Sequence, residues 1–282
     1  MSGATTDTSP REAVEALRAR MALSIVGQAE VIERLLIGLL ANGNLLVEGL
    51  PGLAKTRAIK ALAKNMECDF SRIQFTPDLL PSDVTGTEVY HQASGAGEFR
   101  FEPGPIFANI VLADEINRAP PKVQAALLEA MEERQVTVAG RTHAMPPLFM
   151  VMATQNPIEQ EGTYPLPEAQ LDRFMFNTWV DYPSFDEEVN VVKQTTSDAS
   201  SEVKAVISGD EILAYQQVIR RMPVADNVVD YAVNLVASTR PGRDRATAEV
   251  NQYLSWGAGP RASQYLIVAA KVNAALNGKY SP

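Results

Sequence analysis

The sequence predicts an α/β fold in which a mostly parallel β-sheet, covered by helices on both faces, is followed by a smaller all-helical domain. Three observations lead to this prediction. Short apolar segments typical of buried strands alternate with helical patterns along the first part of the chain. A glycine-rich loop joins the first of these strands to a helix. After Asp181-Tyr182-Pro183 the strand patterns stop, and only helical patterns follow.

The first predicted elements are a helix, a strand and a second helix. Apolar positions over residues 26–42 run into Asn42-Gly43-Asn44, which predicts a helix closed by a glycine cap. Leu45-Leu46-Val47-Glu48 predicts a short strand that leads into the glycine-rich loop. Residues 56–66 carry apolar side chains on one helical face, so we expect a helix directly after the loop.

Further strands, separated by helical patterns such as that of residues 121–134, continue the alternation. They are expected at residues 70–75, 109–113, 148–153 and 174–180. Two stretches interrupt this rhythm, residues 88–101 and residues 135–145, and each has glycine between alternating segments. Each stretch predicts a β-hairpin inserted into the α/β unit, with a disordered loop as the alternative.

The predicted domains follow from these patterns. We expect an N-terminal tail and first helix over residues 1–20, an α/β core over 21–182 and a helical domain over 183–282. The chain stops soon after a long helical pattern, so we expect the helical domain to be truncated at its C-terminus. Its helices are predicted at residues 184–196, 210–221, 226–238 and 261–276.

Composition excludes several classes of protein. Of the 282 residues, 46% are apolar, which is ample for a sizeable core. The net charge of −9 disfavours non-specific binding to nucleic acid or anionic membranes, although a locally basic pore would escape this argument. Cys68 is the single cysteine, so we expect no intramolecular disulfide and a buried structural thiol. The sequence has neither a signal peptide nor a transmembrane run, which predicts a cytoplasmic protein.

The glycine-rich loop is Gly49-Leu50-Pro51-Gly52-Leu53-Ala54-Lys55-Thr56. In a phosphate-binding loop, glycines let backbone N–H groups face the phosphates, a lysine neutralises the β and γ oxygens, and a hydroxyl binds Mg²⁺. Gly49, Gly52, Lys55 and Thr56 fill these roles, whereas Ala54 stands where glycine is usual. The flanking strand and helix favour this interpretation over a chance glycine-rich turn, and they predict binding of ATP or GTP.

Two carboxylates follow the strand Ile110-Val111-Leu112-Ala113. Asp114 is placed to hold Mg²⁺ through water and Glu115 to act as the general base on an attacking water. Alone, two acids at a strand end are a weak signal because they often only solvate it. Asp114 follows Lys55 of the phosphate loop by 59 residues (114 minus 55), and that context makes the signal strong.

An amide and two arginines complete the predicted site. Asn156, after the strand at 148–153, would orient the water or contact the γ-phosphate; a turn-forming Asn is the alternative. Arg173 suits an arginine finger supplied to a neighbouring subunit, and Arg261 could reach the nucleotide of its own chain. Surface ion pairs are the alternative for both. Three other arginines compete for the role in trans: Arg118, Arg134 and Arg141.

Other residues carry weaker signals. His91 and His143 lie in the predicted hairpins, where exposed histidines are the default, and no nucleophile elbow is present. The helix at 121–134 is interpreted as scaffold. Its solvent-facing side carries three acids, Glu129, Glu132 and Glu133.

In this order of elements the chain resembles the MoxR family of AAA+ ATPases from about Ile25 onward. The matching segments are Gly49 to Thr56, Ala113-Asp114-Glu115-Ile116-Asn117-Arg118-Ala119-Pro120-Pro121-Lys122-Val123-Gln124, Ala153-Thr154-Gln155-Asn156-Pro157, and Leu166-Pro167-Glu168-Ala169-Gln170-Leu171-Asp172-Arg173-Phe174. Alanine before the lysine is itself typical of this family. The resemblance as a whole implies an AAA+ core with two inserted hairpins and a helical lid.

The resemblance also implies roles for particular residues. Val26-Gly27-Gln28 is similar to the segment that meets the adenine, Arg173 to the arginine finger in trans, and Arg261 to the second sensor. Glu115, Asn156, Arg173 and Arg261 are then the catalytic candidates, and Thr56 and Asp114 the metal ligands. The candidate nucleotide-binding residues are Val26, Gly27, Gln28, Gly49, Leu50, Pro51, Gly52, Leu53, Ala54, Lys55, Thr56 and Arg57.

The leading hypothesis is an Mg²⁺-dependent ATP hydrolase that forms a hexameric ring. The resemblance implies a chaperone-like remodeller of a protein client, working with von Willebrand factor A domain partners. One alternative is a nucleic-acid motor; the acidic net charge argues against it, and the hairpins offer only Arg100 and Arg141 as basic contacts beside the histidines. A second alternative is an ATP-gated assembly scaffold with little hydrolysis, which intact Glu115 and Asn156 oppose.

Overall fold

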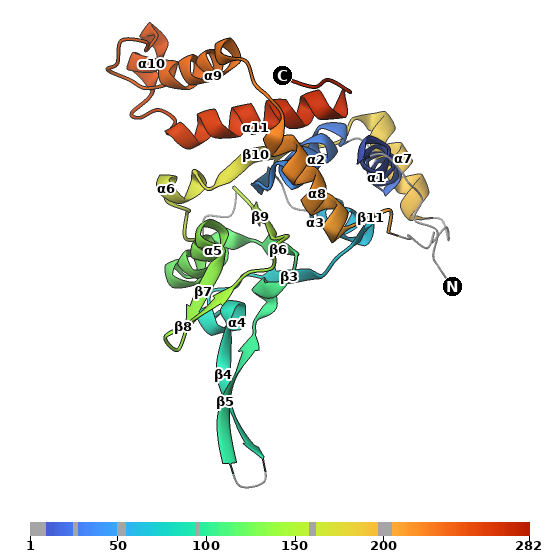
Figure 1. Ribbon diagram of the computed structural model, residues 1–282, viewed down its shortest axis with the longest axis vertical. Coiled ribbons are helices and arrows are strands. Elements are labelled where there is room, and N and C mark those ends of the chain that lie inside the picture. Colours follow the sequence, from blue (N-terminus) through green and yellow to red (C-terminus); the bar gives the residue numbers. More distant parts are fainter. Residues whose placement is uncertain (1–9, 25–27, 50–54, 94–95, 158–161, 197–204) are drawn as a thin grey trace.

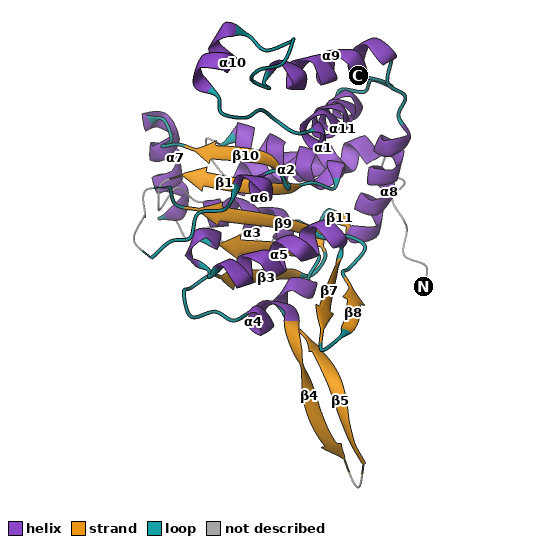
Figure 2. Ribbon diagram, turned by 90° about the vertical axis from the view of Figure 1, so that its left-hand side faces the viewer, coloured by secondary structure: helices purple, strands orange, loops and turns teal. Residues whose placement is uncertain are grey.

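The computed structural model of the chain describes residues 10–24, 28–49, 55–93, 96–157, 162–196 and 205–282. A parallel sheet with helices on both faces forms its centre, a long hairpin projects at one end, and helices gather at the other (Figures 1 and 2). This architecture confirms the predicted α/β class with a helical C-terminal region. None of the helices in the described part of the chain has the length and apolar character that a membrane-spanning segment needs.

The central sheet has five parallel strands. From one edge to the other they are β10 (Phe174–Val180), β1 (Asn44–Gly49), β9 (Met150–Gln155), β6 (Ile110–Asp114) and β3 (Phe70–Gln74). Each agrees with a strand predicted from the sequence to within two residues at either end. Because all five run in the same direction, their carboxyl ends lie along one edge of the sheet and their amino ends along the opposite edge.

Successive side chains of each strand point to opposite faces, so the sheet separates two apolar cores. Leu45 and Val47 belong to the first core, whereas Leu46 between them belongs to the second. Both faces of the strands are buried, which explains why the sequence shows continuous apolar runs there.

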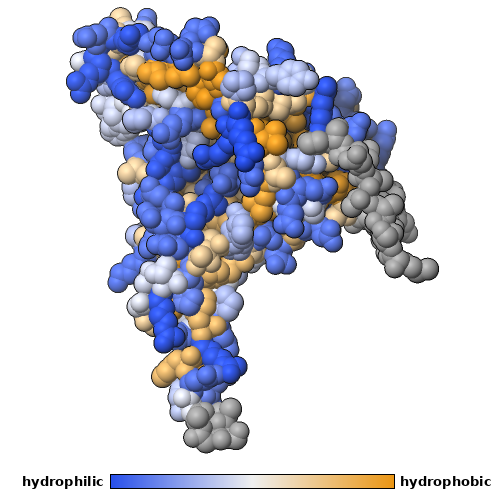
Figure 3. Space-filling view, viewed as in Figure 1, coloured by the Kyte–Doolittle hydropathy of each residue, from blue (hydrophilic) through white to orange (hydrophobic). Residues whose placement is uncertain are grey.

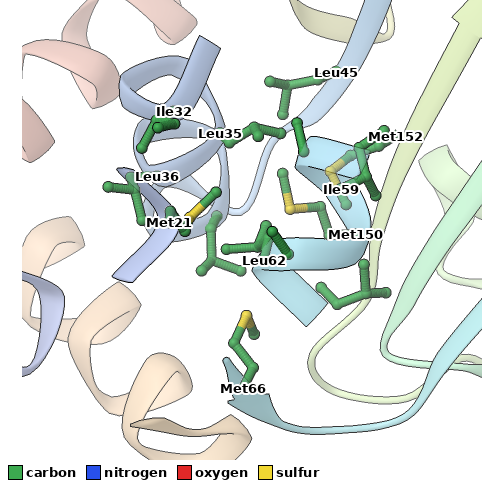
Figure 4. Close-up of a cluster of buried hydrophobic side chains, with 14 of the residues drawn as sticks. Met21, Ile32, Leu35, Leu36, Leu45, Ile59, Leu62, Met66, Met150 and Met152 are labelled. Carbon is green, nitrogen blue, oxygen red and sulfur yellow. The ribbon is translucent and has the colours of Figure 1, made fainter. Parts of the chain in front are cut away.

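The first core is covered by four helices. They are α1 (Pro10–Ser24), α2 (Ala29–Ala41), α3 (Lys55–Lys64) and α8 (Gly209–Arg221). Figure 4 shows its centre, where Leu35 of α2, Leu62 of α3 and Met150 of β9 lie together. This packing fixes α3, the helix that follows the phosphate loop, against the sheet.

The second core lies under α5 (Pro121–Glu133), the predicted scaffold helix. Val123, Leu127 and Met131 of α5 face the sheet, as their spacing predicted. Shorter elements complete this layer, namely α4 (Pro81–Thr85) and the 3-10 helices η1 (Pro105–Phe107) and η2 (Ile116–Arg118).

Both inserted hairpins are present. The long hairpin consists of β4 (Gly86–Ala93) and β5 (Ala96–Pro103), and it projects away from the body of the molecule (Figures 1 and 2). The short hairpin consists of β7 (Gln135–Val138) and β8 (Arg141–Ala144) and directly follows α5. The structure therefore confirms hairpins rather than disordered loops in the described residues of both segments.

Over residues 183–196 and 205–282, which the structure describes, the C-terminal region contains the four predicted helices and a short fifth. They are α7 (Phe185–Thr195), α8, α9 (Asp226–Ser238), α10 (Ala248–Tyr253) and α11 (Pro260–Leu276), and α6 (Glu168–Leu171) lies just before β10. α11 contacts α9, α8 and α2. The division between core and helical domain at residues 182 and 183 remains a prediction.

Two details of the predicted secondary structure are wrong. Strands do not stop at residue 183, because β11 (Ile207–Ser208) pairs in parallel with β2 (Met66–Glu67). Strands of two residues are too short to carry a periodic pattern. The cap of α2 also differs, because Asn42 and not Gly43 takes the left-handed conformation, with φ 56°. Gly43 is required for space instead, since a Cβ there would lie 2.5 Å from the sulfur of Met175.

α9 exposes several apolar side chains among polar ones such as Asp230 and Asn234. Val229, Val233 and Leu235 are each more than a third exposed, and Figure 3 shows apolar side chains gathered over this helix. An apolar surface of this kind is typical of contacts between protein chains.

Candidate active site

The predicted phosphate loop connects β1 to α3 at the carboxyl edge of the sheet. β1 ends at Gly49 with φ 151°, and a Cβ at this position would lie 2.4 Å from the carbonyl oxygen of Val180. Glycine is therefore needed for the chain to leave the sheet here. Seven of the predicted nucleotide-binding residues lie outside the described residues: Val26, Gly27, Leu50, Pro51, Gly52, Leu53 and Ala54.

The other predicted nucleotide-binding residues border this loop. Lys55 begins α3, and Thr56 and Arg57 follow it, with Arg57 exposed. Gln28 precedes the first turn of α2 as its N-cap residue and is half-buried. The elements that flank the loop therefore agree with the predicted order of strand, loop and helix.

Asp114 is the last residue of β6 and is buried. The hydroxyl of Thr154, on neighbouring β9, donates to its Oδ1 at 2.6 Å. Its Oδ2 lies 3.5 Å from the hydroxyl of Thr56 and accepts from Nε and Nη2 of Arg72 at 3.0 and 2.6 Å. The two predicted metal ligands, Thr56 and Asp114, thus lie together.

Glu115 adopts the left-handed conformation, with φ 59° and ψ 49°, which is uncommon for a residue other than glycine. Its backbone N–H donates to the hydroxyl of Thr154 at 3.0 Å. Its carboxylate accepts from Nε2 of Gln74 at 3.0 Å and from Nη1 of Arg118 at 3.2 Å. Backbone strain of this type is found at functional sites, where the surrounding contacts hold it in place.

Three residues of this edge were not singled out from the sequence. Thr154 joins the two acids, because its hydroxyl bonds Asp114 and the backbone of Glu115. Arg72 and Gln74 of β3 reach the carboxylates of Asp114 and Glu115 respectively. The spacing of Arg72 and Gln74, which puts both on one face of the strand, and a threonine two residues before the predicted Asn156 were the signals that could have found them.

Asn156 follows β9 at the same edge and is buried. Its backbone carbonyl oxygen accepts a hydrogen bond from Nδ2 of Asn117 at 3.4 Å. The structure therefore brings Thr56, Asp114, Glu115 and Asn156 to one edge of the sheet.

Arg173 and Arg261 lie at the opposite edge. Arg173 directly precedes β10, and the first residue of β10, Phe174, pairs with Asn44 at the amino end of β1. Arg261 lies in the first turn of α11, and its Nη1 donates to Asp172 at 3.1 Å. β1 has six residues and a strand rises about 3.3 Å per residue, so about 17 Å separates the two edges.

This arrangement corrects one prediction. We expected Arg261 to reach the nucleotide of its own chain, but the structure places it beside Arg173, too far from Thr56 and Asp114 for its side chain to span. The sequence identified the helix on which Arg261 lies, but not where that helix packs. Because α11 packs across α2 and α8, its first turn lies over the amino edge of the sheet.

The two arginines share a single carboxylate, that of Glu132. Arg173 donates to its Oε2 through Nε at 2.7 Å and Nη2 at 2.5 Å, and Arg261 donates to its Oε1 through Nη2 at 2.9 Å. We interpreted Glu132 as a solvent-facing scaffold residue, and this interpretation was incomplete. Helical spacing shows that Glu132 faces away from the sheet, but not what approaches it.

Of the three competing arginines, Arg134 lies near Arg173 and Arg261 at the amino edge, whereas Arg118 and Arg141 lie elsewhere. Arg118 pairs with Glu115 of its own chain at the carboxyl edge. Arg134, the residue after α5, donates to the carbonyl of Phe149 and to the side chain of Asn42 at 2.9 Å. Burial lowers the pKa of the Arg134 guanidinium from its usual value. Arg141 lies on the short hairpin, 3.7 Å from Glu88 of the long hairpin.

The histidines differ from each other. His91 is exposed on the long hairpin and lies 3.4 Å from Glu102, as the default interpretation predicts. His143 is not exposed, which corrects the prediction for it. Its ring stacks on Phe101 with the centroids 3.7 Å apart, so it joins the short hairpin to the base of the long one.

The class of the protein follows from this fold and this site. A parallel sheet with paired acids at its carboxyl edge, two inserted hairpins and a helical C-terminal region defines an AAA+ ATPase. The family described as "ATPase family associated with various cellular activities (AAA)" matches residues 44–176. The crystal structure of a candidate ATPase from Cytophaga hutchinsonii superimposes on this chain with a TM-score of 0.87 and 41% identity, covering 96% of this chain and 82% of that one.

Sequence relatives narrow the class. The chain is 48% identical over 255 residues to chaperone MoxR1 of Mycobacterium tuberculosis, covering 90% of this chain and 67% of the relative. It is 46% identical over 254 residues to uncharacterized protein YeaC of Bacillus subtilis, covering 90% and 76%. Protein MoxR of Methylorubrum extorquens is 30% identical, with 96% and 83% covered. The chain therefore belongs to the MoxR family of AAA+ ATPases.

Proposed function

We propose that this chain is an Mg²⁺-dependent ATP hydrolase whose active sites form between neighbouring subunits of a ring, which we expect to be a hexamer. One observation carries the proposal: Arg173 and Arg261 lie at the edge of the sheet opposite to Asp114 and Glu115. A guanidinium on the γ-phosphate contributes strongly to phosphoryl transfer. In a head-to-tail ring, the arginine edge of one subunit meets the acidic edge of the next.

Thr56 and Asp114 are the residues that would hold the metal ion. Hydroxyl and carboxylate oxygens are ligands that Mg²⁺ prefers, and these two side chains lie 3.5 Å apart. When bound, Mg²⁺ would neutralise charge on the β- and γ-phosphates. Arg72 donates to the same Asp114 oxygen that faces Thr56, so we expect the guanidinium and the metal ion to compete for it.

Glu115 is proposed as the general base. Its carboxylate is about one third exposed, with 33% of the side chain accessible, so water reaches it. Gln74 and Arg118 both donate to Oε2, and no described residue donates to Oε1. That oxygen is left to accept the proton of an attacking water. Asn156, buried at the end of the neighbouring strand, would orient this water or contact the γ-phosphate.

The process that ATP hydrolysis would drive is proposed from the family. A relative with 48% identity is named a chaperone, which supports remodelling of a protein client. A von Willebrand factor A domain partner and a cytoplasmic location are proposed from the family resemblance alone. The long hairpin projects from the body and carries Tyr90 and Phe99, which are 54% and 61% exposed with ring centroids 5.2 Å apart. We expect this aromatic pair to contact the client.

A mixing experiment tests the shared site. Glu115→Gln and Arg173→Ala should each bind ATP but hydrolyse it poorly. When the two variants are mixed, about a quarter of the interfaces pair an intact Glu115 with an intact Arg173, so activity should return to about that fraction of wild type. Mixtures that stay as inactive as their components would overturn the proposal. Sedimentation velocity with ATP should show the ring.

A further inference from the structure

Glu132 occupies a central position in a polar cavity at the amino edge of the sheet. The cavity has a volume of about 250 Å³. Among the described residues that line it, Glu132 is the one carboxylate, and four arginines surround it: Arg134, Arg173, Arg220 and Arg261. Glu132 contacts two of these arginines, Arg173 and Arg261, which are the two that the proposed function needs, and Arg261 also pairs with Asp172.

We propose that Glu132 is a positioning residue that holds Arg173 and Arg261 side by side for the γ-phosphate of the neighbouring subunit. This inference rests on the proposed function. It adds Glu132 of α5 to the two arginines at the amino edge of the sheet. It also means that Arg173 and Arg261 act together on the same phosphate.

Repulsion between the two guanidinium groups favours an anion that contacts both of them. Arg173 comes from the loop before β10 and Arg261 from α11. These two segments are linked through Asp172, which accepts from Arg261, and through the hydroxyl of Tyr265, which donates to the carbonyl of Arg173 at 3.2 Å. Glu132 differs from both because its side chain contacts the two guanidinium groups themselves. Each donates to a different oxygen of the same carboxylate, at 2.5 to 2.9 Å. Two like charges held this close repel each other unless an opposite charge lies between them. Glu132 supplies that charge and one acceptor for each arginine.

Other contacts fix the outer sides of the pair. Arg173 donates through Nη1 to the carbonyl of Ala169 at 2.9 Å, and Arg261 donates through Nη1 to Asp172 at 3.1 Å. A guanidinium has five N–H donors, so each arginine keeps donors for a phosphate after these bonds are made. The side chains of Arg173 and Arg261 are 27% and 31% exposed, and these free donors are therefore accessible from outside the chain.

Glutamine cannot replace Glu132 in this role. Its amide has one acceptor oxygen, so it serves one arginine and turns an NH₂ group toward the other. Glu132→Gln should therefore lower kcat about 100-fold, the loss expected when a catalytic group is displaced by about 1 Å. The KM for ATP and the affinity for a fluorescent ATP analogue should stay as in wild type, because the phosphate loop belongs to the other subunit. Glu129→Gln, one turn earlier on the exposed side of α5, is the matched control and should be unaffected.

Mixing experiments separate positioning from a folding defect. Glu132→Gln mixed with Glu115→Gln should recover activity, because the Glu115→Gln chain supplies an intact arginine edge. Glu132→Gln mixed with Arg173→Ala should stay inactive, because every arginine edge is then defective. A misfolded Glu132 variant would rescue neither partner, and that result would overturn the inference.

The outcome also distinguishes this inference from the proposed function. If Glu115→Gln and Arg173→Ala do not complement each other, the proposal that the active site is shared between subunits is wrong. If they do complement each other but Glu132→Gln keeps wild-type kcat, the shared site stands and only the role of Glu132 is overturned.

Discussion

The hydroxyl of Thr154 offers a quantitative test of the candidate active site. It donates to the carboxylate of Asp114 at 2.6 Å and accepts from the backbone N–H of Glu115 at 3.0 Å, and the residue is 1% exposed. Thr154→Val keeps the volume but removes both bonds. Loss of a bond to a charged group costs about 1.5–3 kcal/mol, and an unpaired buried N–H costs about 1–3 kcal/mol. Taking values near the lower ends of both ranges, we expect Thr154→Val to lower the free energy of unfolding by about 3 kcal/mol.

Urea unfolding measures this loss. With an m value of about 3 kcal/mol per molar urea, a change of about 3 kcal/mol lowers the midpoint by about 1 M. Thr154→Ser is the control, because it keeps the hydroxyl and loses only one buried methyl group, worth about 1 kcal/mol. ATP turnover should fall in the valine variant and largely persist in the serine variant. A valine variant as stable as the serine variant would refute the reasoning, because it would mean that the two hydrogen bonds contribute nothing.

Three further predictions concern other parts of the chain. Gly49→Ala should lower both the melting temperature and the affinity for ATP, because φ 151° and a contact of 2.4 Å with the Val180 carbonyl exclude a Cβ; unchanged ATP titrations would contradict this. Burial, with a smaller contribution from Asp69, raises the pKa of the Cys68 thiol to about 11 from 9.0, so its reaction with a disulfide reagent at pH 8 should be about 100-fold slower in the folded chain than in urea. Equal rates would show that the thiol is accessible. Burial alone would raise the pKa of Glu132, but hydrogen bonds from Arg261 and Arg173 outweigh it and lower that pKa below 4.5. The stability difference between wild type and Glu132→Gln should therefore be complete above pH 4.5 and disappear as the pH falls through the lowered pKa, which pH-dependent unfolding would measure.

The strands and the acidic edge were predictable because local patterns carry them. In a doubly covered parallel sheet both faces are buried, so Ile110 to Ala113 forms an uninterrupted apolar run that stands out in the sequence. The carboxyl ends of parallel strands meet at one edge, and so the polar residues that follow two such strands, Asp114 and Asn156, could be placed together. The roles of these residues in hydrolysis remain predictions.

The arginine edge was predictable only in part because its contacts link distant segments. Glu132 and Arg261 are 129 residues apart, and no local pattern connects them. The position of Arg261 depends on how α11 packs across α2 and α8, which helical spacing does not specify. Similarly, His143 in its hairpin shows no sign of the stacking on Phe101, because the ring contact joins two separate insertions.

α5 has a consequence for how the subunits of a ring would communicate. It begins a few residues after Glu115, at the acidic edge, and its last turn carries Glu132 at the arginine edge. Its 13 residues make a rigid rod about 20 Å long. The residues proposed for one active site are therefore joined through a single helix to the arginines proposed for the next.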